Sequence, residues 1–184
     1  MIELPLFPLN TVLFPGMPLQ LHIFEERYKL MINRCIERRE PFGVALISND
    51  KWDTNSSAEP YKIGCTAQIT QVEPLGGGRM KITAVGRDRF QIMSFDHNQP
   101  YLVGNVELYP LIEDQPNQMR QHARKLQTHV SKYLKLLKES GQVEFQKASL
   151  PDNPTSLAYL AAVLLQTSQT EKQELLEMHD VVSL

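Results

Sequence analysis

Residues 4–32 read LPLFPLNTVLFPGMPLQLHIFEERYKLMI, and this stretch decides the fold class. Its four prolines, at positions 5, 8, 15 and 18, lie among strongly apolar residues. Proline cannot donate a ladder hydrogen bond, so it is confined to strand edges, strand starts and bulges. The segment FPGMP at 14–18 is a turn signal with apolar flanks. The opening therefore predicts short edge strands joined by a turn.

The pattern changes directly after this turn. Leu19, Leu21 and Ile23 alternate with polar residues, which predicts a half-buried strand. Helical spacing then begins and predicts a helix over 25–39, which Pro41 ends. One face of that helix is expected to carry the apolar residues Phe24, Tyr28, Met31, Ile32, Cys35 and Ile36.

The remaining chain divides into a β-rich part and a helical part. Short apolar or alternating runs separated by turns continue to residue 109, giving six or seven strands, which is typical of a barrel or a sandwich. Helical patterns follow over 117–139, around 157–165, and from a capping box at Ser168 and Glu171. The sequence thus predicts an α+β protein with a β-rich domain over 1–111 and a helical bundle over 116–184.

Composition excludes several classes of protein. The 184-residue chain is 42% hydrophobic and 22% charged, with a net charge of -2. A nucleic-acid module is usually strongly basic, so nucleic acid is not an expected partner. Residues 1–10 lack the basic start of a signal peptide, and the longest apolar run, 157–165, is far shorter than the roughly 20 residues of a membrane span. We therefore expect a cytoplasmic protein with no membrane association.

The motifs of catalysis are missing from the sequence. The segment GGGRMKIT at 76–83 lacks phosphate-loop spacing and reads as a hairpin turn. There is no nucleophile elbow, and the five histidines are scattered without metal-ligand spacing. Cys35 and Cys65 fall at positions typical of core residues. We expect no catalytic residue, no metal and no cofactor.

Two features are candidates for binding. The helix 117–139 carries six basic residues against the single acid Glu139, on the side opposite its apolar stripe. This face is either solvated or a docking surface for an acidic partner or nucleic acid, with Arg120, Arg124, Lys132 and Lys135 as the candidate residues. Trp52, in a polar loop, either packs on the barrel or anchors a ligand.

The opening block resembles the signature of the Lon protease N-terminal domain family, also called the Lon substrate-binding domain. The similar features are LPL-x-PL, the FPG turn, the PL-x-L-x-IFE strand end and the RY that follows. Further similar segments cover most of residues 4–178, and they are FGV at 42–44, KIGCTAQI, VGRDRFQI with Gly86, Arg89 and Phe90, YLVGNVE, and LAYLAAVLL followed by EKQELLE.

The resemblance implies a PUA-like mixed β-barrel followed by a small helical bundle. In full-length Lon enzymes this region helps to recognise unfolded or damaged substrates, while a AAA+ motor and a Ser–Lys protease act on them. The sequence contains neither the Walker A motif of such a motor nor the catalytic serine block of such a protease, so we expect a stand-alone, non-enzymatic member. Its expected partners are unfolded or client protein segments, with protease or chaperone machinery.

Three functional hypotheses follow from these patterns. The first is a recognition module that binds exposed apolar segments through Phe14, Met17 and Trp52 at a proline-broken rim. The second is an adaptor that docks partners through the basic helix. The third is RNA binding, because PUA-like barrels elsewhere bind RNA.

Overall fold

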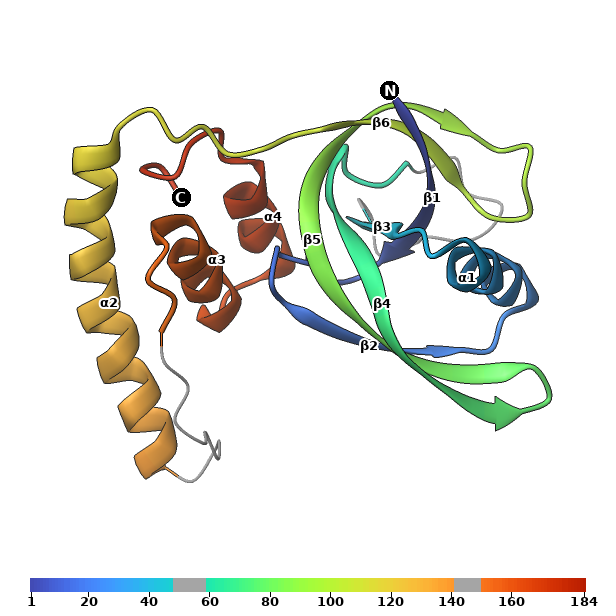
Figure 1. Ribbon diagram of the computed structural model, residues 1–184, viewed down its shortest axis with the longest axis horizontal. Coiled ribbons are helices and arrows are strands. Elements are labelled where there is room, and N and C mark those ends of the chain that lie inside the picture. The colour runs from blue at the N-terminus through green and yellow to red at the C-terminus, as the bar shows by residue number, and fades with distance from the viewer. Residues whose placement is uncertain (48–58, 141–149) are drawn as a thin grey trace. The chain divides into compact units, whose positions relative to one another are not determined.

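The computed structural model describes residues 1–47, 59–140 and 150–184 (Figure 1). These residues form two compact units, which we call the sheet unit and the helical unit. The sheet unit contains residues 1–110 and 167–177, and the helical unit contains residues 111–166 and 178–184. The sequence had placed residues 167–177 with the helical part, whereas they group with the sheet.

The sheet unit is built on one mixed six-stranded sheet in the order β2-β5-β4-β3-β1-β6. β1 and β3 are parallel, and the other neighbours are antiparallel. β6 pairs with β1 and also with the second half of β5, so the sheet curls back on itself. The predicted α+β class with a mixed sheet is confirmed. The strands are β1 Ile2–Leu9, β2 Pro18–Ile23, β3 Phe42–Leu46, β4 Ile63–Gly76, β5 Arg79–Asp96 and β6 Val103–Leu108.

The predicted turn before β2 is confirmed and is locked against β5. The Met17 N–H donates to the Phe14 carbonyl at 3.0 Å, and Gly16 has φ +81°, the positive value that the third position of a type II turn requires. Gly86 of β5 donates its N–H to the Met17 carbonyl at 2.9 Å. A Cβ on Gly86 would lie 2.2 Å from the Phe14 carbonyl oxygen, so only glycine permits this approach.

Helix α1 (Glu26–Arg38) covers the core of the sheet unit. Tyr28, Met31, Ile32 and Cys35 form its buried stripe, with the spacing of one helical face. Each such apolar side chain contributes roughly 1.5–3 kcal/mol through burial. The helix begins one residue later than predicted, after Phe24 and Glu25.

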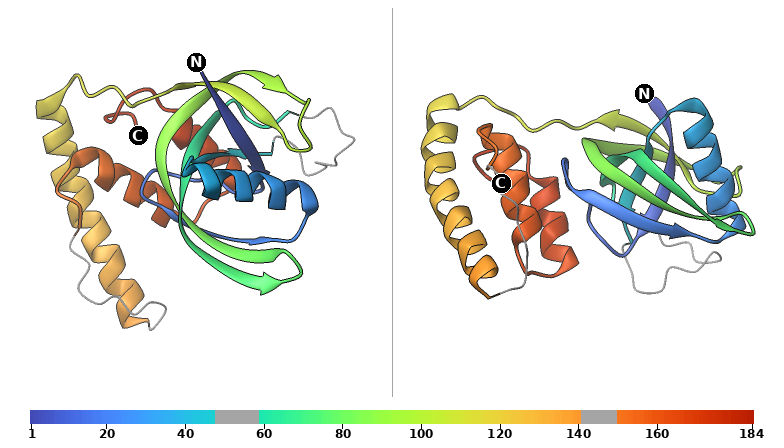
Figure 2. Two further views of the ribbon diagram at one scale, coloured as in Figure 1. Left: turned by 45° about the vertical axis from the view of Figure 1, so that its right-hand side comes forward. Right: turned by 60° about the horizontal axis from the view of Figure 1, so that its bottom comes forward.

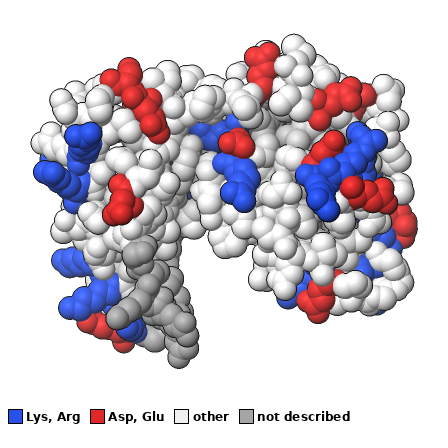
Figure 3. Space-filling view, viewed as in Figure 1, with Lys and Arg blue, Asp and Glu red and all other residues white. Residues whose placement is uncertain are grey.

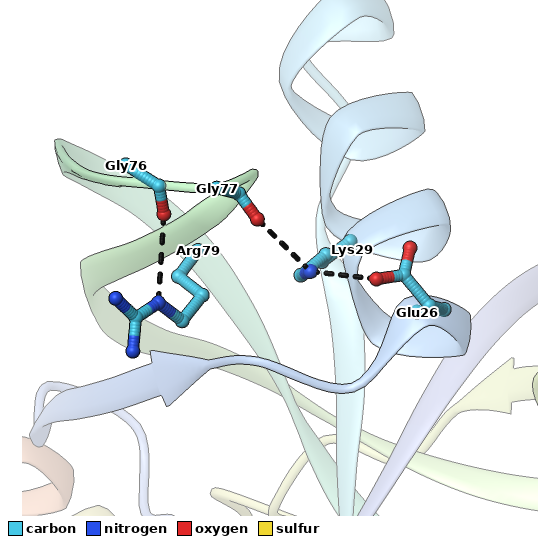
Figure 4. Close-up of polar contacts among 5 residues, drawn as sticks. All are labelled: Glu26, Lys29, Gly76, Gly77 and Arg79. Atoms are coloured by element: carbon cyan, nitrogen blue, oxygen red, sulfur yellow. Dashed lines mark hydrogen bonds and ion pairs between the residues drawn. The ribbon is translucent and has the colours of Figure 1, made fainter.

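The β4–β5 hairpin ends in the predicted glycine turn (Figure 4). Gly76, Gly77 and Gly78 all have positive φ, a conformation that side-chain-bearing residues rarely adopt. Lys29 of α1 donates its ammonium to the Gly77 carbonyl at 3.3 Å and to Glu26 Oε1 at 2.7 Å. The hairpin tip is thereby linked to the first turn of α1.

Helix α4 (Gln169–Glu177) opens with the predicted capping box. The Ser168 N–H donates to Glu171 Oε2 at 2.9 Å, and the Glu171 N–H donates to Ser168 Oγ at 3.2 Å. Hydrogen bonds from the Thr167 and Ser168 side chains hold the pKa of Glu171 at about 2. The carboxylate that caps the helix is thus ionised throughout the neutral range.

Long-range hydrogen bonds explain why α4 belongs to the sheet unit. Three hydrogen bonds connect residues of α4 to residues 1–110 of the sheet unit. Two of them are made by the buried polar side chains of Gln173 and Arg89. The contacts are Val12 N–H to Gln169 Oε1 at 2.9 Å, Gln173 Nε2 to the Ile63 carbonyl at 3.0 Å, and Arg89 Nη1 to the Leu176 carbonyl at 2.5 Å.

The helical unit packs α2 (Pro116–Glu139) beside α3 (Pro154–Leu164) (Figure 2). Asn153 caps α3 as predicted, because its side chain accepts a hydrogen bond from the Ser156 N–H at 2.9 Å. Of α2, Met119 and Val130 are buried. No helix in the described part of the chain is both long and apolar enough to cross a membrane.

Candidate functional site: a groove at the seam of the sheet

Residues at the end of β1 and in β2 line the same groove although the two strands do not pair with each other, and we call this unpaired junction the seam. β2 lies at the edge of the strand order, and no described strand pairs with its outer side. A groove of about 350 Å³ lies at this seam, and we call it the seam groove. It is lined by Phe7, Pro8, Leu9, Asn10, Leu21, His22, Ile23, Phe24, Glu25, Arg27, Tyr28 and Ile47.

Proline explains why the end of β1 can remain unpaired on the side that faces away from β3. The Leu9 carbonyl accepts from the Ile47 N–H on the β3 side, and the Leu6 N–H donates to the Leu102 carbonyl on the opposite side. Backbone polar groups of successive strand residues alternate in direction, so the nitrogen of Pro8 is directed away from β3. Because proline has no N–H, it leaves no donor unpaired there.

The same alternation gives β2 a free polar edge. The Gly86 N–H bonds the Met17 carbonyl, so in the continuing ladder Leu19, Leu21 and Ile23 direct their backbone groups to β5. Gln20 and His22 then direct their N–H and C=O groups outward. A row of outward backbone groups is a template for pairing with another extended chain.

The floor of the seam groove is aromatic and buried. The rings of Phe7 and Tyr28 stack with centroids 4.0 Å apart and an interplanar angle of 10°. Both side chains are mostly buried, and burial raises the pKa of Tyr28. The Arg27 guanidinium lies 4.5 Å from the centroid of the Tyr28 ring. This floor presents flat apolar surface with one cation beside it.

The rim of the groove carries one large exposed apolar side chain. Phe24 is 60% exposed, and its ring centroid is 5.8 Å from that of His22. Arg27 is held by Glu25, with its Nε and Nη2 atoms each 2.9 Å from Glu25 Oε2. An exposed aromatic beside a buried aromatic floor is typical of an anchor for a partner's apolar side chain.

Two of the predicted contact residues are placed differently by the structure. Phe14 is fully buried, so the prediction that it contacts a partner is wrong. The cause is the turn itself, which is pressed against Gly86 and sends the Phe14 side chain inward. Met17 is half-buried and packs against the core. Trp52 lies outside the described residues.

The predicted basic residues are all exposed. Arg120, Arg124, Lys132 and Lys135 lie on α2 in the helical unit, whereas the seam groove lies in the sheet unit. Lys135 Nζ is 3.9 Å from Glu139 Oε1, which is a surface ion pair of small energetic value. Figure 3 shows Lys and Arg side chains gathered on the surface of this helix.

Metal-ligating groups and the two cysteines are candidates for reactive chemistry. They contain no group of three or more His, Cys, Asp or Glu residues that could hold a metal ion. Burial raises the pKa of the Cys35 thiol to about 11 and of the Cys65 thiol to about 12. Both are therefore protonated core residues at neutral pH, as the sequence predicted, and neither is an activated nucleophile.

Comparison with known proteins agrees with this architecture. The family model of the ATP-dependent protease La (LON) substrate-binding domain matches residues 3–183. A Lon protease from Brevibacillus choshinensis is 25% identical over 176 residues, covering 95% of this chain and 23% of that protein. A Lon protease from Flavobacterium johnsoniae is 25% identical over 183 residues, covering 97% and 22%. The chain thus spans less than a quarter of the length of these relatives.

Solved structures show the same fold. A Lon N-terminal domain protein from Xanthomonas campestris superposes with a TM-score of 0.67 at 23% identity, covering 98% of this chain and 93% of that one. The N-terminal domain of a Mycobacterium avium complex Lon protease gives a TM-score of 0.68 at 18% identity, covering 99% and 93%. With the family model spanning nearly every residue, the chain belongs to the LON substrate-binding domain family.

Proposed function

We propose that this chain is a non-catalytic recognition module that binds extended apolar segments of unfolded or client proteins at the seam groove. The observation that carries the proposal is the free edge of β2 beside an aromatic floor. The family to which the chain belongs supports a role in substrate recognition. Protease or chaperone machinery in the cytoplasm is the partner class that such a module would serve.

Backbone pairing supplies the affinity that does not depend on sequence. A client segment in extended conformation adds beside β2 and exchanges hydrogen bonds with the outward groups of Gln20 and His22. Each such bond contributes about 1 kcal/mol net. Because every polypeptide carries the same backbone groups, this contact suits a module that meets many different unfolded chains.

Side-chain pockets supply the preference for apolar segments. In an extended client, alternate side chains point to the same face, so every second residue can enter the groove. Phe24 at the rim and the Phe7–Tyr28 stack on the floor offer it apolar contact. The Arg27–Glu25 ion pair at the same rim restricts the orientation of a polar neighbour.

Phe24→Ser tests the side-chain contribution. We expect about a threefold to tenfold loss of affinity for a labelled, apolar extended peptide of about eight residues, measured by fluorescence anisotropy. The matched control is Leu30→Ser, because Leu30 is 56% exposed but does not line the groove. If the two variants bound the peptide with equal affinity, Phe24 would not be part of the binding site.

A further inference from the structure

A second groove lies in the helical unit, between α2 and α3. It consists of two adjoining cavities of about 380 and 310 Å³ that share Leu126 and His129. We call it the α2–α3 groove. On α2 it runs from Met119 to Tyr133, a separation of 14 residues, or about 21 Å of helix. The opposite wall is apolar, with Ala158, Ala161 and Leu164 of α3, Leu165 directly after it, and, in the larger cavity, Val181, Val182 and Leu184.

The groove presents more apolar surface than the helical unit covers. Leu165, which lines the smaller cavity, is 50% exposed. Tyr133 on the α2 wall is only half-buried. The length of this apolar groove, about 21 Å, matches that of an amphipathic helix of about four turns.

The charge around this groove selects the partner. Lys125 lines the larger cavity, and Lys132 lies seven residues further along, almost in line with it on the same side of α2. Both side chains are exposed. No Asp or Glu side chain occurs among the described residues that line either cavity. Lys125 and Lys132 therefore place two exposed cations beside the apolar floor, and we call them the ridge pair.

We propose that the α2–α3 groove binds an acidic amphipathic helix of a partner protein. The apolar face of the partner helix lies against Leu126, Tyr133 and Leu165. Asp or Glu residues on its flank meet Lys125, which lines the groove, and Lys132, seven residues further along α2. This site is separate from the seam groove, because all of its residues belong to the helical unit. It would allow the chain to hold a fixed partner while the sheet unit binds an extended client.

The helical wheel also divides the predicted basic face. Lys132 belongs to the ridge pair, whereas Arg120 and Lys138 lie roughly 140° away from Lys125 around the helix. Arg120 and Lys138 are exposed on the same helix and carry the same charge as the ridge pair. They provide a matched control for any effect that depends on net charge alone.

The test uses the full chain and designed helical peptides of about 14 residues. The first peptide has leucines at i, i+3, i+4 and i+7 with glutamates on the flanks. The second has lysines in place of the glutamates, and the third is a scrambled version of the first. We expect the acidic peptide to bind at least tenfold more tightly than either of the others, by fluorescence anisotropy at about 0.1 M salt.

Variants then locate the site. The pair Lys125→Glu and Lys132→Glu should weaken binding of the acidic peptide about tenfold, and Leu165→Glu should do the same by charging the apolar wall. The control pair Arg120→Glu and Lys138→Glu should change it less than threefold. Circular dichroism of each variant verifies that the helices are retained.

Three results would overturn the proposal. One is equal weakening by the ridge pair and the control pair. Another is displacement of the acidic peptide by single-stranded RNA, which would assign the basic surface to phosphate binding. The third is a dimer of the chain alone that Leu165→Glu disperses, which would assign the groove to a second copy. Loss of seam-groove binding in a Phe24→Ser variant leaves the acidic-peptide result unchanged.

Discussion

Replacing Arg89 by methionine should lower the free energy of unfolding by about 3 kcal/mol. Arg89 is 2% exposed and donates Nη1 to the Leu176 carbonyl and Nε to the Tyr109 carbonyl at 3.0 Å. Its guanidinium also lies 4.7 Å from the centroid of the Tyr109 ring. The Leu176 carbonyl is in the last turn of α4, where the helix dipole favours a cation. Methionine fills similar volume but leaves both carbonyls without these donors.

Chemical denaturation followed by circular dichroism measures this effect. The matched control is Arg87→Met, because Arg87 lies two residues earlier on the same strand and is exposed. We expect the control to change stability by less than about 0.5 kcal/mol. If the two variants were equally stable, the hydrogen bonds of Arg89 would not contribute to holding α4 on the sheet.

Replacing His22 by proline should reduce the affinity for an extended apolar peptide at least tenfold. The His22 N–H is directed to the free edge of β2, so proline removes that donor and fills its position with ring carbons. Pairing with β5 is retained, because the neighbouring Leu21 and Ile23 make the ladder bonds. The expected loss corresponds to one main-chain hydrogen bond together with the steric block.

His22→Ala separates the backbone contribution from that of the side chain. Alanine removes the imidazole that lies beside Phe24 but keeps the outward N–H. We expect its peptide affinity to stay within about threefold of the parent chain, with both variants retaining the parent's thermal unfolding midpoint to within a few degrees. Equal affinities of His22→Pro and His22→Ala would show that clients do not pair with β2.

Local sequence rules predicted the features that depend on neighbours in the chain. Gly16 and its adjacent proline specify the turn before β2, because only a residue that tolerates positive φ fits there. Ser168 and Glu171 specify the start of α4 through reciprocal hydrogen bonds three residues apart. Pro8 lies in the part of β1 that extends beyond its pairing with β6.

Features that depend on contacts between distant parts of the chain could not be predicted from the sequence. Phe14 was expected at the rim but is buried, because its turn closes on Gly86, 72 residues later. Phe24 fitted the apolar stripe of α1, but the helix begins after it and leaves it exposed. The buried amide of Gln173 bonds the carbonyl of Ile63, which is far away in the sequence. Each of these placements is set by tertiary contacts that periodicity does not encode.

Amide hydrogen exchange of β2, with and without a saturating extended apolar peptide, tests the central claim most directly. The account predicts that the amides of Gln20 and His22 exchange at least tenfold more slowly when the peptide is bound, because they then donate to its backbone. The amides of Leu19 and Leu21, already bonded to β5, should change little. Unchanged exchange at Gln20 and His22 under saturating peptide would contradict recognition at the seam.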